Sequence, residues 1–186
     1  MILPIYALGQ PVLKKVATPI EPDYPGLSEL IENMWETMYN ADGVGLAAPQ
    51  IGKSIRIFMI DTQQIEEDDE GTGKNGIKQV FINPQKIEEG GKPWDYEEGC
   101  LSIPDVRGDV KRPAQIKLRY QDENFEVHEK VFVGLIARVI QHEYDHLEGI
   151  LFTELLKPLK KRRVKRRLEN IRKGNIEPDY KMKFAK

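Results

Sequence analysis

Apolar residues early in the chain recur with the period of an α-helix. Over residues 27–38 they fall on one helical face, while glutamates fill the opposite face. This pattern is typical of an amphipathic helix whose apolar stripe packs on a protein core. We therefore predict an N-terminal amphipathic helix, with its methionines and tryptophan in the core rather than in a binding site. The stripe consists of Leu27, Leu30, Ile31, Met34, Trp35 and Met38.

The segment before this helix has no such period. Residues 1–25 are rich in proline and in short apolar pieces, and proline is disfavoured in a helix interior. We expect an extended N-terminal arm packed on the surface.

Runs of β-branched and aromatic residues mark the middle of the chain. Residues 54–61 and 78–87 have this composition, which is typical of strands. Two further runs, 115–120 and 125–132, flank the turn-like sequence 122–124 and predict a β-hairpin. Mostly antiparallel sheet is therefore expected here.

Two features of this region receive no role in a site. Residues 62–76 are acidic and contain glycines, which indicates a solvated loop. His128 lies in the predicted hairpin without a companion ligand nearby in sequence. We interpret it as a strand or surface histidine.

Basic residues dominate a late segment that also carries a narrow apolar seam. Residues 160–167 contain seven lysines and arginines, and Val164, Leu168 and Ile171 share one helical face. A basic amphipathic helix is predicted within residues 155–173, and its charge run alone is typical of a solvated surface. Residues 175–186 are expected to be frayed or loosely packed.

Composition limits the possible class of protein. With 186 residues, 40% of them hydrophobic and 31% charged, the chain can form one substantial core but not two independent ones. No apolar run approaches the ~20 residues that span a bilayer, and the first residues lack the basic region of a signal peptide. We expect one domain, a cytoplasmic location, and neither a membrane nor a DNA partner.

The strongest chemical signal is the sequence Gln141–His146, which holds two of the three histidines. His142 and His146 are four residues apart, so on a helix both imidazoles can reach one divalent ion, with Glu143 beside them as a candidate general base. Apolar residues 135–140 predict that this helix begins near Val133, and Gly149 is its expected C′ residue. A chance match on an amphipathic helix remains open, because the motif fixes three positions.

Cys100 is the single cysteine, so it cannot form an internal disulfide. Two imidazoles and one thiolate would leave a fourth tetrahedral position for water, as in a catalytic metal site. A thiol nucleophile with a histidine base and an inert buried cysteine are the alternatives.

A third segment, residues 43–50, has little side-chain bulk because it contains two glycines and two alanines. It lacks the lysine of a phosphate-binding loop. Both a tight structural turn and a strand lining a ligand site fit it, and Gln50 breaks its apolar pattern.

Taken together, Gly43–Gln50, Glu98–Ser102 and Gln141–His146 resemble the three signature blocks of the peptide deformylases, in the same order and with similar spacing. The resemblance covers the chain from about Ile5 to Leu159. It implies an α+β metallo-hydrolase, with mostly antiparallel sheets around a central metal-binding helix. Such an enzyme removes the formyl group from the N-terminal formylmethionine of new polypeptides.

Applied to this sequence, the resemblance makes Cys100, His142 and His146 the ligands of one divalent metal ion. The family usually holds Fe²⁺, with Zn, Ni or Co as substitutes. Glu143 becomes the general acid/base, which accepts a proton from metal-bound water and returns it to the departing amine.

The resemblance also assigns residues that contact the substrate. The Gln50 side chain and the Leu101 backbone N–H are expected to stabilise the oxyanion. The peptide is expected to run alongside the glycine-containing segment as an added strand. The matched substrate-binding positions are Gly43, Val44, Gly45, Glu98, Gly99, Arg107 and Val139.

The expected organisation is a catalytic domain over residues 1–159, extended by a basic helix and tail over residues 160–186. The resemblance implies that this helix contacts ribosomal RNA, whose phosphates suit a basic stripe. Arg138 departs from the apolar residue expected at its position, and we expect its stem to point outward. The alternatives are a zinc endopeptidase and a non-catalytic rRNA-binding protein.

Overall fold

The protein, described by a computed structural model over residues 1–65 and 76–186, combines sheets and helices in one α+β fold. Its strands are β1 (Ile5–Tyr6), β2 (Gly45–Ala47), β3 (Ile57–Asp61), β4 (Lys78–Gly90), β5 (Trp94–Cys100), β6 (Ile103–Arg112), β7 (Gln115–Gln121), β8 (Val127–Val133) and β9 (Met182–Lys183). Its helices are α1 (Leu27–Asn40), α2 (Gly134–Leu147) and α3 (Pro158–Arg172). Short 3₁₀ helices are η1 (Pro11–Lys14), η2 (Ala48–Ile51), η3 (Thr62–Gln64) and η4 (Phe152–Leu155).

Antiparallel pairing dominates, as predicted. One five-stranded antiparallel sheet has the order β2-β3-β4-β7-β8, and β5 and β6 form a separate antiparallel hairpin. The predicted β7–β8 hairpin is confirmed, with Gln115 opposite Val133 and Gln121 opposite Val127. A short parallel pair, β1 with β9, joins the two ends of the chain.

Strand β3, between β2 and β4, is buried on both faces, which explains its continuous apolar run. Phe58 and Ile60 belong to the core cluster that includes residues of α2. Ile57 and Met59 belong to the cluster that includes the apolar stripe of α1. The two helices therefore cover opposite faces of the five-stranded sheet.

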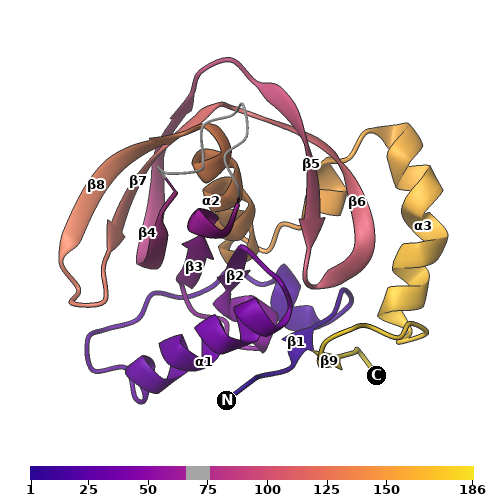
Figure 1. Ribbon diagram of the computed structural model, residues 1–186, viewed down its shortest axis with the longest axis horizontal. Coiled ribbons are helices and arrows are strands. Elements are labelled where there is room, and N and C mark those ends of the chain that lie inside the picture. Colours follow the sequence, from indigo (N-terminus) through magenta and orange to yellow (C-terminus); the bar gives the residue numbers. More distant parts are fainter. Residues whose placement is uncertain (66–75) are drawn as a thin grey trace.

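Helix α2 lies between this sheet and the β5–β6 hairpin (Figure 1). Ala137, Ile140 and Leu147 pack into the sheet's core. After the helix, Gly149 adopts a φ of +71°, and a Cβ there would lie 2.7 Å from the Lys14 carbonyl oxygen. Its predicted role at the C′ position is confirmed, because this conformation favours glycine.

Helix α3 confirms the prediction of a basic amphipathic helix. Val164 and Ile171 are buried in a third cluster with Val106 and Val110 of β6, and Leu168 packs against it. Most of the helix surface outside this seam carries basic residues. Among the described helices, none is both long and apolar enough to cross a membrane.

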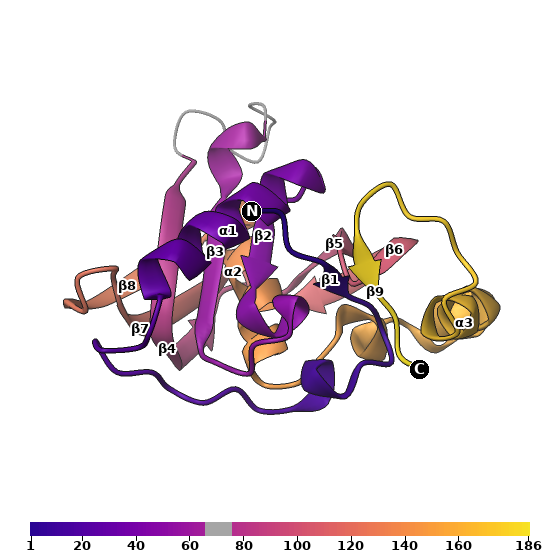
Figure 2. The ribbon, with the colours of Figure 1, turned by 90° about the horizontal axis from the view of Figure 1, so that it is seen from below.

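Several expectations from sequence are wrong at the chain ends. Residues 175–186 are not frayed throughout, because β9 pairs with β1 (Figure 2). The Gln10 side chain also donates to the Phe184 carbonyl at 2.8 Å. The N-terminal arm does not lie only on the surface, because its side chains Ile5, Leu8 and Leu13 are buried.

The acidic segment 62–76 was expected to be a solvated loop, and its residues 66–75 lie outside the described part of the chain. Its first residues differ from that expectation. Thr62–Gln64 form η3, and the buried Thr62 hydroxyl accepts a hydrogen bond from the backbone N–H of Ile77 at 2.9 Å.

Candidate metal centre and active site

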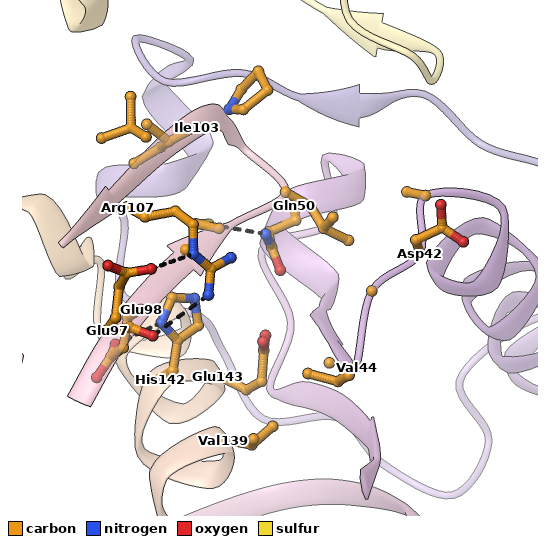
Figure 3. A pocket seen from close by; sticks show the side chains of 18 of the residues that line it. Asp42, Val44, Gln50, Glu97, Glu98, Ile103, Arg107, Val139, His142 and Glu143 are labelled. Atoms are coloured by element: carbon orange, nitrogen blue, oxygen red, sulfur yellow. Dashed lines mark hydrogen bonds and ion pairs between the residues drawn. The ribbon is translucent and has the colours of Figure 1, made fainter. Parts of the chain in front are cut away.

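A cavity of about 530 Å³ opens where α2, β2 and the β5–β6 hairpin meet (Figure 3). A volume of this size suits a small ligand or a short peptide. All the predicted site residues line it except His146, which lies deeper. The lining set is Gly43, Val44, Gly45, Gln50, Glu98, Gly99, Cys100, Leu101, Arg107, Val139, His142 and Glu143.

The three predicted metal ligands converge. Cys100 ends β5, while His142 and His146 lie on successive turns of α2. One donor atom from each lies within 4.8 Å of the others, and Cys100 Sγ is 3.4 Å from His146 Nε2. A thiolate and two imidazoles in this arrangement fit a four-coordinate divalent ion with one position left open.

Glu98 fixes the orientation of His142, the first histidine of this cluster. Its Oε1 lies 2.9 Å from His142 Nδ1, which leaves Nε2 of His142 for a metal. Such a carboxylate partner is typical of metal-binding histidines. Burial alone would raise the pKa of Glu98, but hydrogen bonds from His142 and Arg112 outweigh it and hold the pKa well below its usual value.

Two arginines complete a buried charge network around Glu98. Arg112 donates to both carboxylate oxygens of Glu98, at 2.8 and 3.0 Å, and to Asp145 at 2.8 Å. Arg138 donates to Glu98 Oε2 at 2.8 Å. The network therefore connects β5 and β6 to α2 directly beside the cluster of Cys100, His142 and His146.

The expectation that Arg138 points outward is wrong. Arg138 is only 2% exposed, and its guanidinium also donates to the carbonyl oxygens of Val110 at 2.8 Å and Trp94 at 2.7 Å. The same group lies 4.8 Å from the centre of the Trp94 ring. Several acceptors and an aromatic face thus replace the water that an exposed arginine would contact.

Glu143 is a buried carboxyl group with an unmatched oxygen. It is 5% exposed, and within the described residues its Oε2 has no hydrogen-bond partner. Burial raises its pKa to about 7. A carboxyl group with this pKa can both accept and release a proton near neutral pH.

Gly45 makes room for this carboxyl group. A Cβ at Gly45 would lie 2.6 Å from Glu143 Oε1, so any side chain there would displace it. At Gly43 a Cβ would lie 2.7 Å from Leu101 Cδ1. The small residues of this segment therefore allow it to approach both α2 and the tip of the β5–β6 hairpin, Leu101–Ser102, which we call the hairpin tip. This packing role is additional to any contact with a ligand.

Gln50 is held with its amide nitrogen directed at the hairpin tip. Its Oε1 accepts from the Ala47 N–H at 3.0 Å, so Nε2 is available as a donor. Nε2 lies 3.2 Å from Ser102 Oγ and 3.5 Å from Cys100 Sγ. The side chain is 1% exposed, and its orientation is fixed by these contacts.

The remaining predicted substrate positions lie around the cavity mouth (Figure 3). Arg107 lies across Gly99, where a Cβ would come within 2.9 Å of its Nη1, and it forms an exposed ion pair with Glu97 at 3.1 Å. Val139 and Val44 face the cavity from α2 and from the segment before β2.

Sequence patterns missed Arg112, Asp145 and the tail residue Tyr180. The first two carry the charge network, and Tyr180 lines the cavity and donates to the Leu101 carbonyl. Asp145 lies inside the histidine motif, so its position between the two histidines was a usable signal. Nothing in the sequence pattern marked the other two.

His128 remains outside the cavity, on β8, and its Nε2 lies 2.7 Å from Oδ2 of Asp122. With Glu126 it makes a second group of possible ligand atoms on the hairpin surface. Exposed groups of this kind are common without an ion, so they add nothing to the site.

Comparisons with known proteins agree with this geometry. The family model for polypeptide deformylase matches residues 2–162. A peptide deformylase of Christiangramia forsetii is 59% identical, over 99% of this chain and 96% of its own length.

Solved structures give the same result. A peptide deformylase from Plasmodium falciparum superposes with a TM-score of 0.82 at 30% identity, covering 91% of this chain and 95% of that chain. A class I type b peptide deformylase from Acinetobacter baumannii, crystallised with bound Met-Ala-Ser, has a TM-score of 0.74 at 35% identity, covering 84% and 99%. The chain therefore belongs to the polypeptide deformylase family, metal-dependent hydrolases that act on formyl-methionyl peptides.

Proposed function

We propose that Cys100, His142 and His146 hold one divalent metal ion and that Glu143 is the proton-transfer group of a deformylation site. The observation that carries this proposal is the convergence of the three donor atoms within 4.8 Å beside a buried, unmatched carboxylate oxygen. We assign Fe²⁺ as the cellular metal, with Zn, Ni or Co as substitutes. When bound, such an ion lowers the pKa of a coordinated water and polarises the formyl carbonyl.

Glu143 performs both proton transfers. With its pKa raised to about 7, the carboxylate takes a proton from the attacking water and delivers it to the departing amine nitrogen. As charge develops on the formyl oxygen, Gln50 Nε2 and the backbone N–H of Leu101 donate hydrogen bonds to it. Removing one such donor typically costs ~3 kcal/mol of transition-state stabilisation.

The substrate peptide binds as an added strand. Strand β2 is the edge of the five-stranded sheet, so within residues 1–65 and 76–186 one side of its backbone has no neighbouring strand. A peptide pairing with this edge would be recognised by main-chain hydrogen bonds, with little dependence on its sequence. Val44, Val139 and Leu135 supply apolar surface for the methionine side chain.

The test is hydrolysis of formyl-Met-Ala-Ser by protein purified without air, with metal content measured on the same sample. The wild type should release formate with one metal ion per chain. Glu143→Gln keeps the shape of the side chain but cannot accept the proton, so kcat should fall about 10²–10⁴-fold at unchanged metal content.

The outcomes separate this proposal from its alternatives. A wild type that retains stoichiometric metal but releases no formate contradicts it. Cleavage of internal bonds in unformylated peptides would instead support an endopeptidase. Normal activity in a Cys100→Ala variant would remove the thiolate from the ligand set.

We also propose that α3 docks the enzyme on ribosomal RNA, so that residues 160–186 extend a catalytic domain ending at residue 159. Lys161, Arg162, Arg163, Lys165 and Arg166 are exposed, and none has an ion pair with any residue that the structure describes. Unpaired cations on one helix suit phosphate contacts. This location near nascent chains would place the enzyme in the cytoplasm.

Docking is tested by sedimentation of the full chain with ribosomes at several salt concentrations. Replacing the five cations with glutamine should weaken binding and flatten its salt dependence, because fewer counterions are released. The control is a variant in which Lys117 and Arg119 of β7, both paired with Glu129 of β8, are replaced with glutamine. Equal sedimentation of all three proteins at low salt would exclude docking through α3.

A further inference from the structure

The chain after α3 returns to the active-site cavity. Pro178, Asp179 and Tyr180 line the cavity, although Glu143 is the nearest other lining residue in the sequence and the whole of α3 lies between them. The β1–β9 pair holds this segment in place (Figure 2). Just before β9, the Lys181 carbonyl accepts from the Ile5 N–H at 2.9 Å. Residues 178–180 therefore form part of the cavity lining and are held in a fixed position.

One hydrogen bond joins residues 178–180 to the hairpin tip. The Tyr180 hydroxyl donates to the carbonyl oxygen of Leu101 at 2.6 Å. Burial raises the pKa of Tyr180, and the nearby Cys100, Asp105 and Asp179 raise it further. The hydroxyl consequently stays protonated at neutral pH, which is the state that donates to a carbonyl.

The hairpin tip is anchored on its other side by the N-terminal arm and by η2. The Leu8 N–H donates to the Ser102 carbonyl at 2.9 Å, and Gln50 Nε2 lies 3.2 Å from Ser102 Oγ. These contacts fix Ser102. The carbonyl of the preceding residue, Leu101, is held by Tyr180.

This arrangement bears on catalysis because Leu101 lies outside both strands of the hairpin, in its turn. The N–H and the carbonyl of Leu101 belong to two neighbouring peptide planes, which are joined through its φ and ψ. When the carbonyl loses its anchor, these two angles can change more freely, and the plane that carries the N–H can turn. An oxyanion donor must lie about 2.7–3.1 Å from the developing charge, so a small rotation weakens it.

We propose that Tyr180 is a positioning residue for deformylation: by holding the Leu101 carbonyl, it fixes the direction of the Leu101 N–H. The inference rests on the oxyanion role assigned to Leu101 above. Tyr180 acts through Leu101 and does not need to touch the substrate. The C-terminal tail thereby becomes part of the catalytic apparatus of this chain.

The test is Tyr180→Phe, which removes the hydroxyl and keeps the ring. With formyl-Met-Ala and formyl-Met-Ala-Ser as substrates, kcat should fall about 3- to 10-fold for both, the range expected for one neutral hydrogen bond. KM should change by less than about twofold, because ground-state binding is not altered. In ¹⁵N-labelled protein, the amide signal of Leu101 should shift and its hydrogen exchange should accelerate.

Tyr6→Phe is the matched control. The Tyr6 hydroxyl accepts from Lys183 Nζ at 3.3 Å, so this variant removes a hydroxyl from the tail contact without reaching Leu101. It should leave kcat and the Leu101 amide unchanged. Rates are compared at a temperature at which circular dichroism shows each variant to be folded.

The alternatives give different results. A rise in KM that depends on peptide length, with kcat unchanged, would make the tail a substrate contact and overturn the positioning role. Equal losses in Tyr180→Phe and Tyr6→Phe would attribute the effect to tail detachment and also overturn it. Unchanged kinetics of Tyr180→Phe in an active enzyme would overturn this inference alone, whereas an inactive wild type would overturn the proposed function as well.

Discussion

Basic residues occur in two regions of this molecule with opposite surroundings. Beside the candidate metal site, Arg112 and Arg138 are 7% and 2% exposed and share the carboxylate of Glu98, itself 4% exposed. On α3, residues 161–163 and 165–166 are exposed lysines and arginines, and within the described chain they have no acidic partner. The same residue types thus occupy both extremes of burial.

The difference shows that burial, and not residue type, decides what a charge does here. A buried guanidinium loses its hydration and must recover it from acceptors, so its position is fixed and it fixes others. The Glu98 network orients His142 in this way. An exposed cation is solvated and contributes little to the fold, which leaves it available to an external anion.

The largest expected effect is that of Arg112→Ala. The substitution leaves Glu98 and Asp145 without their main partner, and breaking a buried pair typically costs ~3–5 kcal/mol. The free energy of unfolding of metal-free protein, measured in urea, should fall by this amount. Metal-free protein is used so that altered metal affinity does not contribute.

Arg119→Ala is the comparison for this variant. Arg119 also makes two hydrogen bonds to one carboxylate, that of Glu129, but its side chain is 54% exposed. Its loss should cost less than ~1 kcal/mol. Similar losses in the two variants would mean that burial does not distinguish these arginines.

Arg138→Met should have a smaller effect than Arg112→Ala. Glu98 keeps Arg112 and His142, while the carbonyls of Val110 and Trp94 lose a donor. We expect a loss of ~1–3 kcal/mol in the same urea experiment. Arg138→Lys should not restore stability, because one ammonium group cannot reproduce the planar fork that reaches all three acceptors. Full recovery with lysine would show that charge alone suffices.

How well each element could be predicted from the sequence depends on how local its pattern is. The stripe of α1, the β7–β8 hairpin and the end of α2 at Gly149 depend on local patterns, and all were predicted close to their observed bounds. The spatial cluster of Cys100, His142 and His146 was also accessible, because two of these residues share one helix and the third is the only cysteine.

The β5–β6 hairpin was missed for a physical reason. In β6 the inward positions alternate, but they include Gly108 and Arg112 beside Val106 and Val110. A buried arginine and a glycine interrupt the apolar period that sequence analysis recognises. The burial of Arg138 could not be predicted either, because its hydrogen-bond acceptors lie on β5 and β6 and not on its own helix.

The tail could not be predicted because its partners are distant. Strand β9 has two residues and pairs with β1 at the opposite end of the chain. No local period marks so short a strand, and Tyr180 contacts the site only once this pairing forms. Long-range contacts of this kind carry information that a window of neighbouring residues lacks.

The smallest effect on stability is expected for the α3 variant in which Lys161, Arg162, Arg163, Lys165 and Arg166 all become glutamine. Like charges four residues apart, such as 161 with 165 and 162 with 166, repel each other by ~0.2–0.5 kcal/mol per pair. Removing them should leave the free energy of unfolding unchanged or slightly higher, and kcat on formyl-Met-Ala-Ser should not change. By contrast Val164→Ala, in the buried seam of the same helix, should cost ~1–3 kcal/mol. If the charge variant were the more destabilised of the two, the cations of α3 would be holding the fold together, and their availability to an external partner would lose its basis.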